Sequence, residues 1–303
     1  MKYAFVLNPA AGTGFASRAM EDIRKVLDQK QIEYEVFETE HPRHATELTA
    51  QLAQRDDISC IVSVGGDGTL SESVQGIAGT GKTLAVIPAG TGNDFIKTVG
   101  IPGKPDEALD WLFADETVSC DAGKINESTF INVCGCGFDV TVLDCAEKMK
   151  KHFRGLLPYL LGLIQAIFKY RPVKLDLTYD GKQESGEYLI CAIGNGRYIG
   201  GGIPICPEAS VTDGLLDLVL VKNVPRWKIP AYLPGLMMSK ILKFKITRHI
   251  LAKHVEIDGS DLRINIDGEI RPMNHVVFDI LPGAVKLKKS PEVKGIMEKE
   301  SKQ

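Results

Sequence analysis

The fold of the N-terminal half is decided by the stretch Ile58-Ser59-Cys60-Ile61-Val62-Ser63-Val64-Gly65-Gly66-Asp67-Gly68-Thr69. Its first seven residues form an apolar run, typical of a central strand buried on both faces. The glycine-rich loop that follows lies at the carboxyl end of that strand, where ligands bind in open α/β sheets. Strand and helix patterns alternate around this stretch, and that order predicts a parallel sheet with right-handed crossovers.

The elements around the central strand follow from hydrophobic periodicity. Strands are predicted over residues 3–7, 34–39, 58–64 and 83–88. Helices are predicted over 17–29, 45–55, 71–76 and 106–114. The alternation of strand and helix patterns ends after about Asp121.

In the second half, strand patterns come close together and are separated by Asp-Gly and Asn-Gly turns, which indicates antiparallel β structure. Strands are predicted over 129–133, 174–179, 188–194, 215–221, 254–257, 263–266, 276–281 and 284–287. Two helical segments, 142–170 and 227–243, interrupt them. We therefore expect an N-terminal Rossmann-like three-layer α/β nucleotide domain over 1–125 and a C-terminal β-sandwich domain over 126–287. The tail, 288–303, either frays or returns to the first domain.

Composition excludes several classes of protein. The 303 residues carry a net charge of −3 with a pI near 6.1, so nothing favours a nucleic-acid partner. Seven cysteines without CxxC pairs are typical of buried thiols in a reducing compartment. The longest apolar stretch, residues 155–168 within the apolar segment 153–170, is shorter than the roughly 18 apolar residues that a spanning helix needs. That segment is either a core helix or an entry helix for acyl chains, with the basic residues of 148–154 meeting anionic headgroups.

Three glycine-rich loops follow strands of the first domain, at 8–14, 65–69 and 90–94. Such loops turn backbone N–H groups towards an anion, and three on one sheet edge favour a polyphosphate site. Asp67 and Asp94 lie within these loops, and Asp121 ends another predicted strand. Carboxylates beside phosphates call for a bridging Mg²⁺. Neither the P-loop pattern nor the complete G-x-G-x-x-G is present, so a NAD-dependent oxidoreductase is a weak alternative.

Several motifs occur in order along nearly the whole chain, over residues 3–287. They are Asn8-Pro9-x-x-Gly12, Gly65-Gly66-Asp67-Gly68-Thr69, Pro88-x-Gly90-Thr91-x-Asn93-Asp94-Phe95, Asn195-Gly196-x-x-x-Gly200-Gly201-Gly202, Pro207-x-Ala209-x-x-x-Asp213-Gly214-x-Leu216-Asp217 and Asp267-Gly268-Glu269. Together they resemble the bacterial diacylglycerol kinase-like lipid kinases, a group that includes the sphingosine kinases. The resemblance implies two domains, with ATP bound by the first and the active site in the cleft between them.

The resemblance also implies roles for individual residues. Asp67, Asp94 and Asp121 form the acidic network around catalytic Mg²⁺, and Glu269 is the general base, supported by Asp267. The implied nucleotide contacts are Asn8, Pro9, Ala10, Ala11, Gly12, Thr39, Gly65, Gly66, Asp67, Gly68, Thr69, Leu70, Ser71, Thr91 and Asn93.

A structural Mg²⁺ is implied at the Asp213 carboxylate and the carbonyls of Ser210 and Leu215. From local sequence alone, Asp213 and Glu269 are equally consistent with simple Asp-Gly turns. Many relatives carry a lysine where this chain has Thr13, so Arg18 or Lys97 is expected to supply the missing cation.

The predicted activity is ATP-dependent phosphorylation of a lipid hydroxyl, with diacylglycerol the leading acceptor. Phosphatidylglycerol, a sphingoid base, or a soluble acceptor such as NAD remain alternatives, as does a lipid-binding protein without turnover. The resemblance implies a cytoplasmic enzyme in peripheral contact with the inner membrane face, and a homodimer as one mode of assembly.

Overall fold

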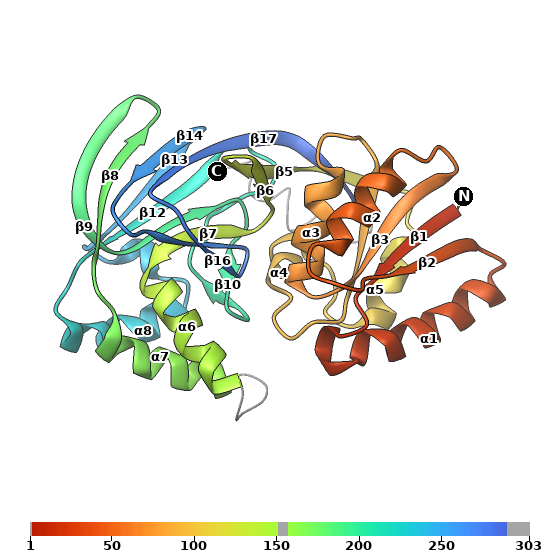
Figure 1. Cartoon of the computed structure of the whole chain (residues 1–303), viewed down its shortest axis with the longest axis horizontal. Helices are drawn as coiled ribbons and strands as arrows, with labels where there is room; N and C mark the ends of the chain where they lie inside the picture. The colour runs from red at the N-terminus through yellow and green to blue at the C-terminus, as the bar shows by residue number, and fades with distance from the viewer. Residues whose placement is uncertain (1, 151–156, 290–303) are drawn as a thin grey trace. The chain divides into compact units, whose positions relative to one another are not determined.

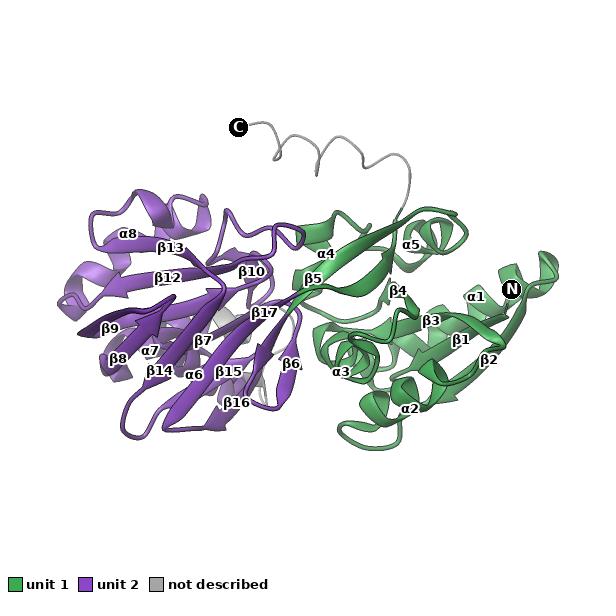
Figure 2. Cartoon of the chain, turned by 90° about the horizontal axis from the view of Figure 1, so that it is seen from above, with its two compact units in different colours: residues 1–122, 282–303 green, residues 123–281 purple. Residues whose placement is uncertain are grey.

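The computed structural model describes residues 2–150 and 157–289 (Figure 1). The chain divides into two compact units, coloured separately in Figure 2. One comprises Met1–Ala122 with Pro282–Gln303, and the other comprises Gly123–Leu281. The predicted domains end at 125 and 287. Residues 282–287 belong instead to the first unit, because the end of the last strand pairs there.

The first unit is built on a parallel sheet in the order β2-β1-β3-β4-β17. Its strands are β1 (Lys2–Leu7), β2 (Glu33–Glu38), β3 (Ile58–Gly65), β4 (Thr83–Pro88) and the end of β17 (His275–Lys288). Side chains along β1, β3 and β4 are almost entirely buried, as continuous apolar runs require in a sheet covered on both faces. The predicted parallel sheet is confirmed.

Helices cover both faces of this sheet (Figure 2). On one face α1 (Phe15–Gln29) packs with α5 (Pro105–Leu112), and on the other α2 (His44–Ala53) packs with α3 (Asp67–Ile77). Helix α3 begins four residues before the predicted 71–76. A short helix, α4 (Asp94–Val99), was not predicted, because its six residues are too few to show a period.

The second unit is mainly antiparallel. The main strand order is β16-β15-β7-β9-β8-β14-β17, with β12 between β9 and β13. The bounds are β5 (Thr117–Ile125), β6 (Ser128–Phe130), β7 (Val133–Gly137), β8 (Val173–Tyr179), β9 (Lys182–Gly194), β10 (Tyr198–Ile199), β11 (Ile203–Pro204), β12 (Leu216–Lys222), β13 (Thr247–Ala252), β14 (His254–Asp258), β15 (Arg263–Ile266) and β16 (Glu269–Pro272). The predicted antiparallel β domain is confirmed.

Some predicted boundaries in this unit were wrong. The predicted strand 129–133 is two strands, β6 and β7, and the predicted pair 276–281 and 284–287 is the single strand β17. Gly283, which lies between the two predicted strands, has a positive φ of 63° and bends the continuous strand β17. Short strands such as β13 and β16 were missed. The Asp258-Gly259 turn does not join paired strands, since β14 pairs with β8 and β17 while β15 pairs with β7 and β16.

The helices of this unit are α6 (Phe138–Lys150), α7 (Leu157–Lys169) and α8 (Ile229–Met237), with short 3₁₀ turns η2 (Arg226–Lys228) and η3 (Ile241–Lys243). All three helices cover one face of the sheet (Figure 1). The predicted helical segment 142–170 is thus two helices, and 227–243 is a helix between two 3₁₀ turns. Residues 151–156, part of the predicted entry helix, lie outside the described residues.

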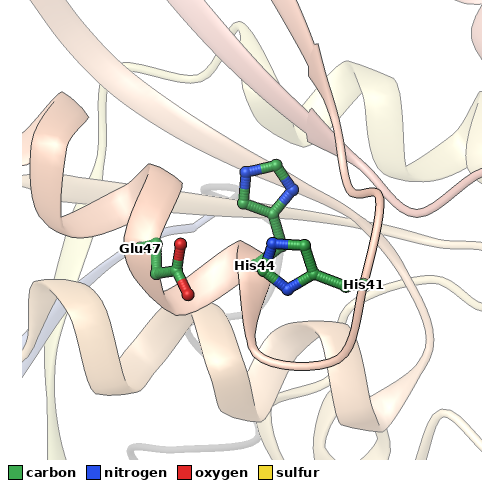
Figure 3. Close-up of side chains that lie close together, drawn as sticks. All are labelled: His41, His44 and Glu47. Carbon is green, nitrogen blue, oxygen red and sulfur yellow. The ribbon is translucent and has the colours of Figure 1, made fainter.

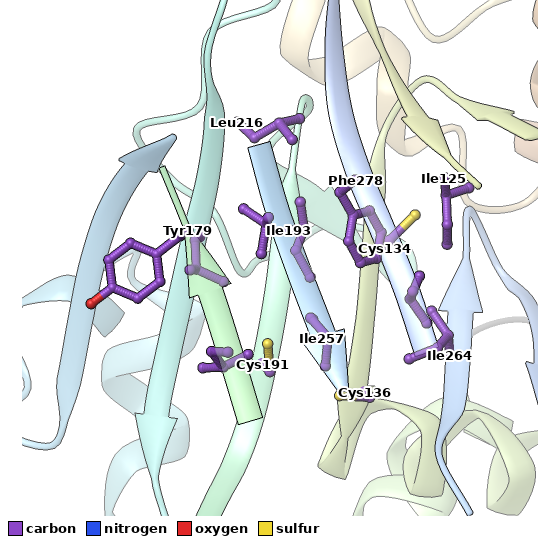
Figure 4. Close-up of a cluster of buried hydrophobic side chains, with 14 of the residues drawn as sticks. Ile125, Cys134, Cys136, Tyr179, Cys191, Ile193, Leu216, Ile257, Ile264 and Phe278 are labelled. Atoms are coloured by element: carbon purple, nitrogen blue, oxygen red, sulfur yellow. The ribbon is translucent and has the colours of Figure 1, made fainter. Parts of the chain in front are cut away.

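Alternation along the strands builds two cores. Leu216, Leu218 and Leu220 of β12 join one core inside the β layers, part of which Figure 4 shows. Val219 and Val221 face the other way, against Phe138, Tyr170 and Ile229 of the helical layer. All seven cysteines are buried and free, as predicted. Among the described residues, no helix is long and apolar enough to cross a bilayer.

Gly123 of β5 lies directly opposite Phe130 of β6, and a Cβ built on it would stand 2.0 Å from the Phe130 ring. We expect Gly123→Ala to lower the free energy of unfolding by about 1–3 kcal/mol, because the fully buried ring has no room to move. Gly103→Ala is the control, since nothing lies within 4 Å of its Cβ position. Urea unfolding of both variants checks this, and equal stabilities would contradict it.

Candidate functional site

The three glycine-rich loops of the first unit meet at the carboxyl ends of β1, β3 and β4. A Cβ on Gly90 would lie 2.4 Å from the Cα of Gly66, so these two backbones touch. A Cβ on Gly12 would lie 2.4 Å from the carbonyl oxygen of Ala89, and its φ of 59° is in the left-handed region. Both contacts require glycine. The predicted convergence of the three loops is therefore confirmed by direct contact between their backbones.

Polar side chains fix the loops to one another. The Asn8 side-chain amide donates to Thr69 Oγ1 at 3.1 Å, which links the first loop to the second. The Ala89 N–H donates to the Gly65 carbonyl at 2.7 Å, which links the third loop to the second. Asn93, at a φ of 49°, bonds both backbone groups of Gly90 through its side chain. These bonds hold the three loops as one cradle.

The start of α3 lies in the middle of this cradle. Gly66 is its N-cap and no side chain caps the helix, so the first N–H groups remain available to an anion. Gly68 is exposed, with nothing within 4 Å of its Cβ position. Thr69, Leu70 and Ser71 are buried, so those three predicted contacts do not present their side chains to solvent. Exposed Thr91 and half-buried Thr39 lie on neighbouring loops.

Asp67 and Asp94 form the acidic part of the cradle. Asp67 Oδ1 accepts the N–H groups of Asp94 at 2.6 Å and Phe95 at 3.3 Å. Burial raises the pKa of Asp67, and the nearby Asp94 charge adds to the rise, while these backbone bonds oppose it. Two mutually repelling carboxylates beside a phosphate cradle suit Mg²⁺, which takes one or two protein carboxylates. These residues therefore fit the ion that the sequence predicts.

Asp121 is placed differently, and it lies within β5 rather than at the end of a strand as predicted. Its Oδ1 accepts the N–H of Gly283 at 2.7 Å, which fixes the bend in β17. Within residues 2–150 and 157–289, the one group of three metal-binding side chains whose ligand atoms lie within 4.8 Å of one another is elsewhere. The structure therefore does not bring Asp121 together with Asp67 and Asp94 to that distance, and its role in the acidic network remains a prediction.

The cation expected in place of the family lysine has a candidate in Lys97. Its ammonium group donates to Asp94 Oδ1 at 2.9 Å and to the Gly92 carbonyl at 2.8 Å. Arg18 instead lies beside the first loop, its guanidinium 3.8 Å from the Cβ position of Gly14. Thr13 turns its hydroxyl onto the Gly12 carbonyl. Both cations border the cradle, and Lys97 contacts Asp94 directly.

In the second unit, Glu269 follows a tight hairpin. Asp267 and Gly268 have positive φ values of 47° and 99°, and Ile266 pairs with Glu269 across the turn. The Asp267 carboxylate accepts three backbone N–H groups, from Ile131, Asn132 and Val133, at 2.9–3.1 Å. Asp267 thus anchors the hairpin to the start of β7, which gives a physical basis for the predicted support of Glu269.

Arg271 is a partner of Glu269 that sequence reasoning missed. Its guanidinium donates to both carboxylate oxygens of Glu269, at 3.0 and 2.8 Å. The Glu269 hydrogen bond is the largest cause of a raised pKa for Arg271. Residues two apart on a strand share a face, but β16 was not among the predicted strands, so the Glu-x-Arg spacing did not indicate this pair.

The proposed structural-ion residues form a local turn. Asp213 is exposed, and its Oδ1 accepts the N–H of Leu215 at 3.0 Å. The hydroxyls of Ser210 and Thr212 lie 3.4 Å apart. This Asx turn satisfies the simple-turn interpretation, and the metal role stays a prediction.

An apolar pocket of about 40 Å³ lies inside the second unit, between α8, η3 and the sheet. Ile229, Tyr232 and Leu236 of α8 line it from one side, and Leu189 of β9 and Val221 of β12 from the other. By comparison, a single water needs roughly 10–15 Å³. No charged side chain lines the pocket.

His41, His44 and Glu47 are the one described group whose spacing would suit a metal (Figure 3). The two rings are stacked, 4.4 Å apart and 14° from parallel, so one ion cannot lie in both ring planes. The Glu40 N–H donates to His44 Nδ1, which leaves the proton of the neutral ring on Nε2. In this arrangement His44 is not a metal ligand.

The comparisons with known proteins agree with this division. Residues 2–125 match the family model for the diacylglycerol kinase catalytic domain, and residues 132–289 match the YegS C-terminal NAD kinase beta sandwich-like domain. A Mycobacterium tuberculosis protein named diacylglycerol kinase is 29% identical over 296 residues, covering 94% of each chain.

Two further proteins extend the likeness. A YegS-like probable lipid kinase of Pseudomonas putida is 34% identical over 233 residues, 76% of each chain. A solved diacylglycerol kinase structure from Bacillus anthracis has a TM-score of 0.78 at 26% identity, over 96% of this chain and 98% of that one. The chain therefore belongs to the diacylglycerol kinase and YegS-like family of lipid kinases.

Proposed function

We propose that this lipid kinase phosphorylates the free hydroxyl of diacylglycerol, giving phosphatidic acid. The observation that favours a lipid acceptor is the lining of the pocket under α8, which is apolar throughout. NAD would bring many polar groups, and burying them against this lining without hydrogen-bond partners is costly. Relatives named diacylglycerol kinase support the same acceptor.

Within the first unit, the glycine cradle would bind the polyphosphate of ATP through backbone N–H groups. The exposed face at Gly68 and the uncapped start of α3 leave space for it. Asp67 and Asp94 would hold Mg²⁺, which supplies charge neutralisation at the phosphates. Lys97 would hold the Asp94 carboxylate in place through its hydrogen bond.

Within the second unit, Glu269 would accept the proton of the lipid hydroxyl. As that O–H bond breaks, the hydroxyl oxygen forms a bond to the terminal phosphorus of ATP, and ADP leaves with the former bridging oxygen. Arg271 orients the carboxylate through its two hydrogen bonds, and Asp267 fixes the turn that presents it. Peripheral contact with a membrane would deliver the acceptor.

Glu269→Gln is expected to lower kcat for transfer of radiolabelled phosphate from ATP to diacylglycerol in mixed micelles by about 10²–10⁴-fold, because the amide cannot take up the proton. Glu127→Gln, at an exposed glutamate of the same unit, is the control and keeps wild-type activity. Undiminished transfer by the Glu269 variant would remove that residue from the base role.

The same assay also tests the acceptor. Phosphatidylglycerol, sphingosine and NAD replace diacylglycerol in parallel reactions, and we expect diacylglycerol to give the highest kcat/KM. Faster phosphorylation of any of the other three would overturn the proposed acceptor. No transfer to any lipid by the purified protein would favour a lipid-binding role without turnover.

Gly68→Ala is expected to weaken ATP binding at least tenfold while leaving the free energy of unfolding within about 0.5 kcal/mol of wild type. The added methyl group meets no protein atom within 4 Å, so it can clash only with a bound ligand. Gly103→Ala, which is equally open, should bind ATP normally. Calorimetric titration measures the ATP affinity of both variants, and urea unfolding measures their stability. Equal ATP affinities would place the nucleotide elsewhere.

A further inference from the structure

A long acid-free segment runs through the helical side of the second unit. Residues 218–255 contain no aspartate or glutamate, although the whole chain carries a net charge of −3. Six exposed cations of this segment lie at or near η2, α8 and η3, namely Lys222, Arg226, Lys228, Lys240, Lys243 and Lys245. Such a local excess of one sign attracts an anionic surface.

Large apolar side chains are exposed among these cations. Trp227 of η2 is 76% exposed, and Met237 and Met238 at the end of α8 are 59% and 61% exposed. Phe168 of α7 is 72% exposed, two residues before Tyr170, whose carbonyl accepts a hydrogen bond from Arg226 at 2.9 Å. Exposed apolar side chains of this size beside exposed cations are typical of an interaction surface.

We propose that this cationic–apolar face, made by Trp227, Met237, Met238 and Phe168 with the six cations, docks onto a bilayer that contains anionic phospholipid. Trp is enriched at the level of the lipid headgroups in membrane proteins, and the flexible Met side chains adapt to acyl chains. The lysines and arginines meet the headgroup phosphates while their stems cover apolar surface.

The charge of the face argues against a second copy of this chain as its occupant. A two-fold contact would place the same patch against itself, so each cation would face another cation without an acidic side chain in the segment to offset it. An anionic bilayer provides the opposite charge over a large, adaptable surface. Vesicle binding tests for a bilayer as the occupant, and analytical ultracentrifugation tests for a second copy.

Helix α8 connects the face to the apolar pocket. Ile229, Tyr232 and Leu236 line the pocket, while Met237 and Met238 of the same segment point to solvent. A lipid leaving the bilayer beside α8 would meet the pocket on its other side. This part of the inference rests on the proposed function, whereas docking itself does not.

The chain holds two tryptophans, Trp111 of α5 and Trp227, so a Trp111→Phe variant makes Trp227 the sole reporter. With phosphatidylcholine vesicles containing 30% phosphatidylglycerol, we expect its emission to shift to the blue and to be quenched by brominated acyl chains. Pure phosphatidylcholine vesicles should produce neither change. Emission that stays unchanged with both kinds of vesicle would overturn the inference.

Charge reversal gives a second arm. Lys240→Glu, Lys243→Glu and Lys245→Glu together should lower the partition coefficient onto the anionic vesicles at least tenfold in a sedimentation assay. The matched control reverses Lys25, Lys30 and Lys104, which are exposed lysines of the first unit, and should bind as wild type. Binding of wild type should weaken with added NaCl, because salt screens exposed charges. Equal loss in both triple variants would show a net-charge effect and overturn the assigned face.

Two measurements separate docking from catalysis. Glu269→Gln should bind vesicles normally while losing transfer, and the lysine variant should keep transfer to short-chain diacylglycerol in free solution. Loss of soluble-substrate transfer in the lysine variant would overturn a purely docking role. Analytical ultracentrifugation completes the set, since a dimer that Trp227→Ala dissociates, without vesicle binding, would assign the face to a second copy.

Discussion

The close approach of three loop backbones in the first unit is the constraint on which the rest of the site depends. A Cβ on Gly12 or Gly90 would clash with neighbouring backbone, and a Cβ on Gly66 would stand only 3.1 Å from Gly90 Cα, so glycine lets the three loops touch. Asp67 then accepts the first amide groups of α4, which ties the third loop to the second. A carboxylate in this position costs free energy through burial and through repulsion by Asp94, as the raised pKa of Asp67 reflects. A bound cation would lower that cost.

Much of the fold could be predicted from the sequence because its signals are local. The apolar runs of β1, β3 and β4 and the glycine-rich loops after them indicated the parallel sheet and its ligand edge. Errors arose where a signal is local but the outcome depends on distant partners. Gly283 resembles a turn residue, yet Asp121 holds its N–H and the strand continues. The six-residue α4 exists because Asp67, 27 positions earlier, caps it.

The candidate site shows the same contrast between local signals, which could be predicted, and distant partners, which could not. Motif spacing identified Asp67, Asp94, Asp267 and Glu269, but it did not reveal that Asp267 binds the backbone of 131–133, more than 130 residues earlier. The Glu269–Arg271 pair was missed together with β16, since strand alternation shows such a pair only once the strand is predicted. From the sequence, the basic residues of 148–154 were considered for membrane contact, whereas 218–255 was not. An absence of acidic residues matches no known motif. Exposure of Trp227 and Met237 became visible only with the fold.

The path of the chain through its two units has a consequence for synthesis. The second unit is contiguous, whereas the first needs both 1–122 and the end of β17, where Lys286 and Leu287 pair with Thr83 and Leu84 of β4. A nascent chain emerging from the ribosome therefore contains every residue of the later unit before the earlier one can close its sheet. Until then the outer edge of β4 lacks its parallel neighbour, and an unpaired edge can recruit other strands. The order of completion on the ribosome is thus the reverse of the order along the chain.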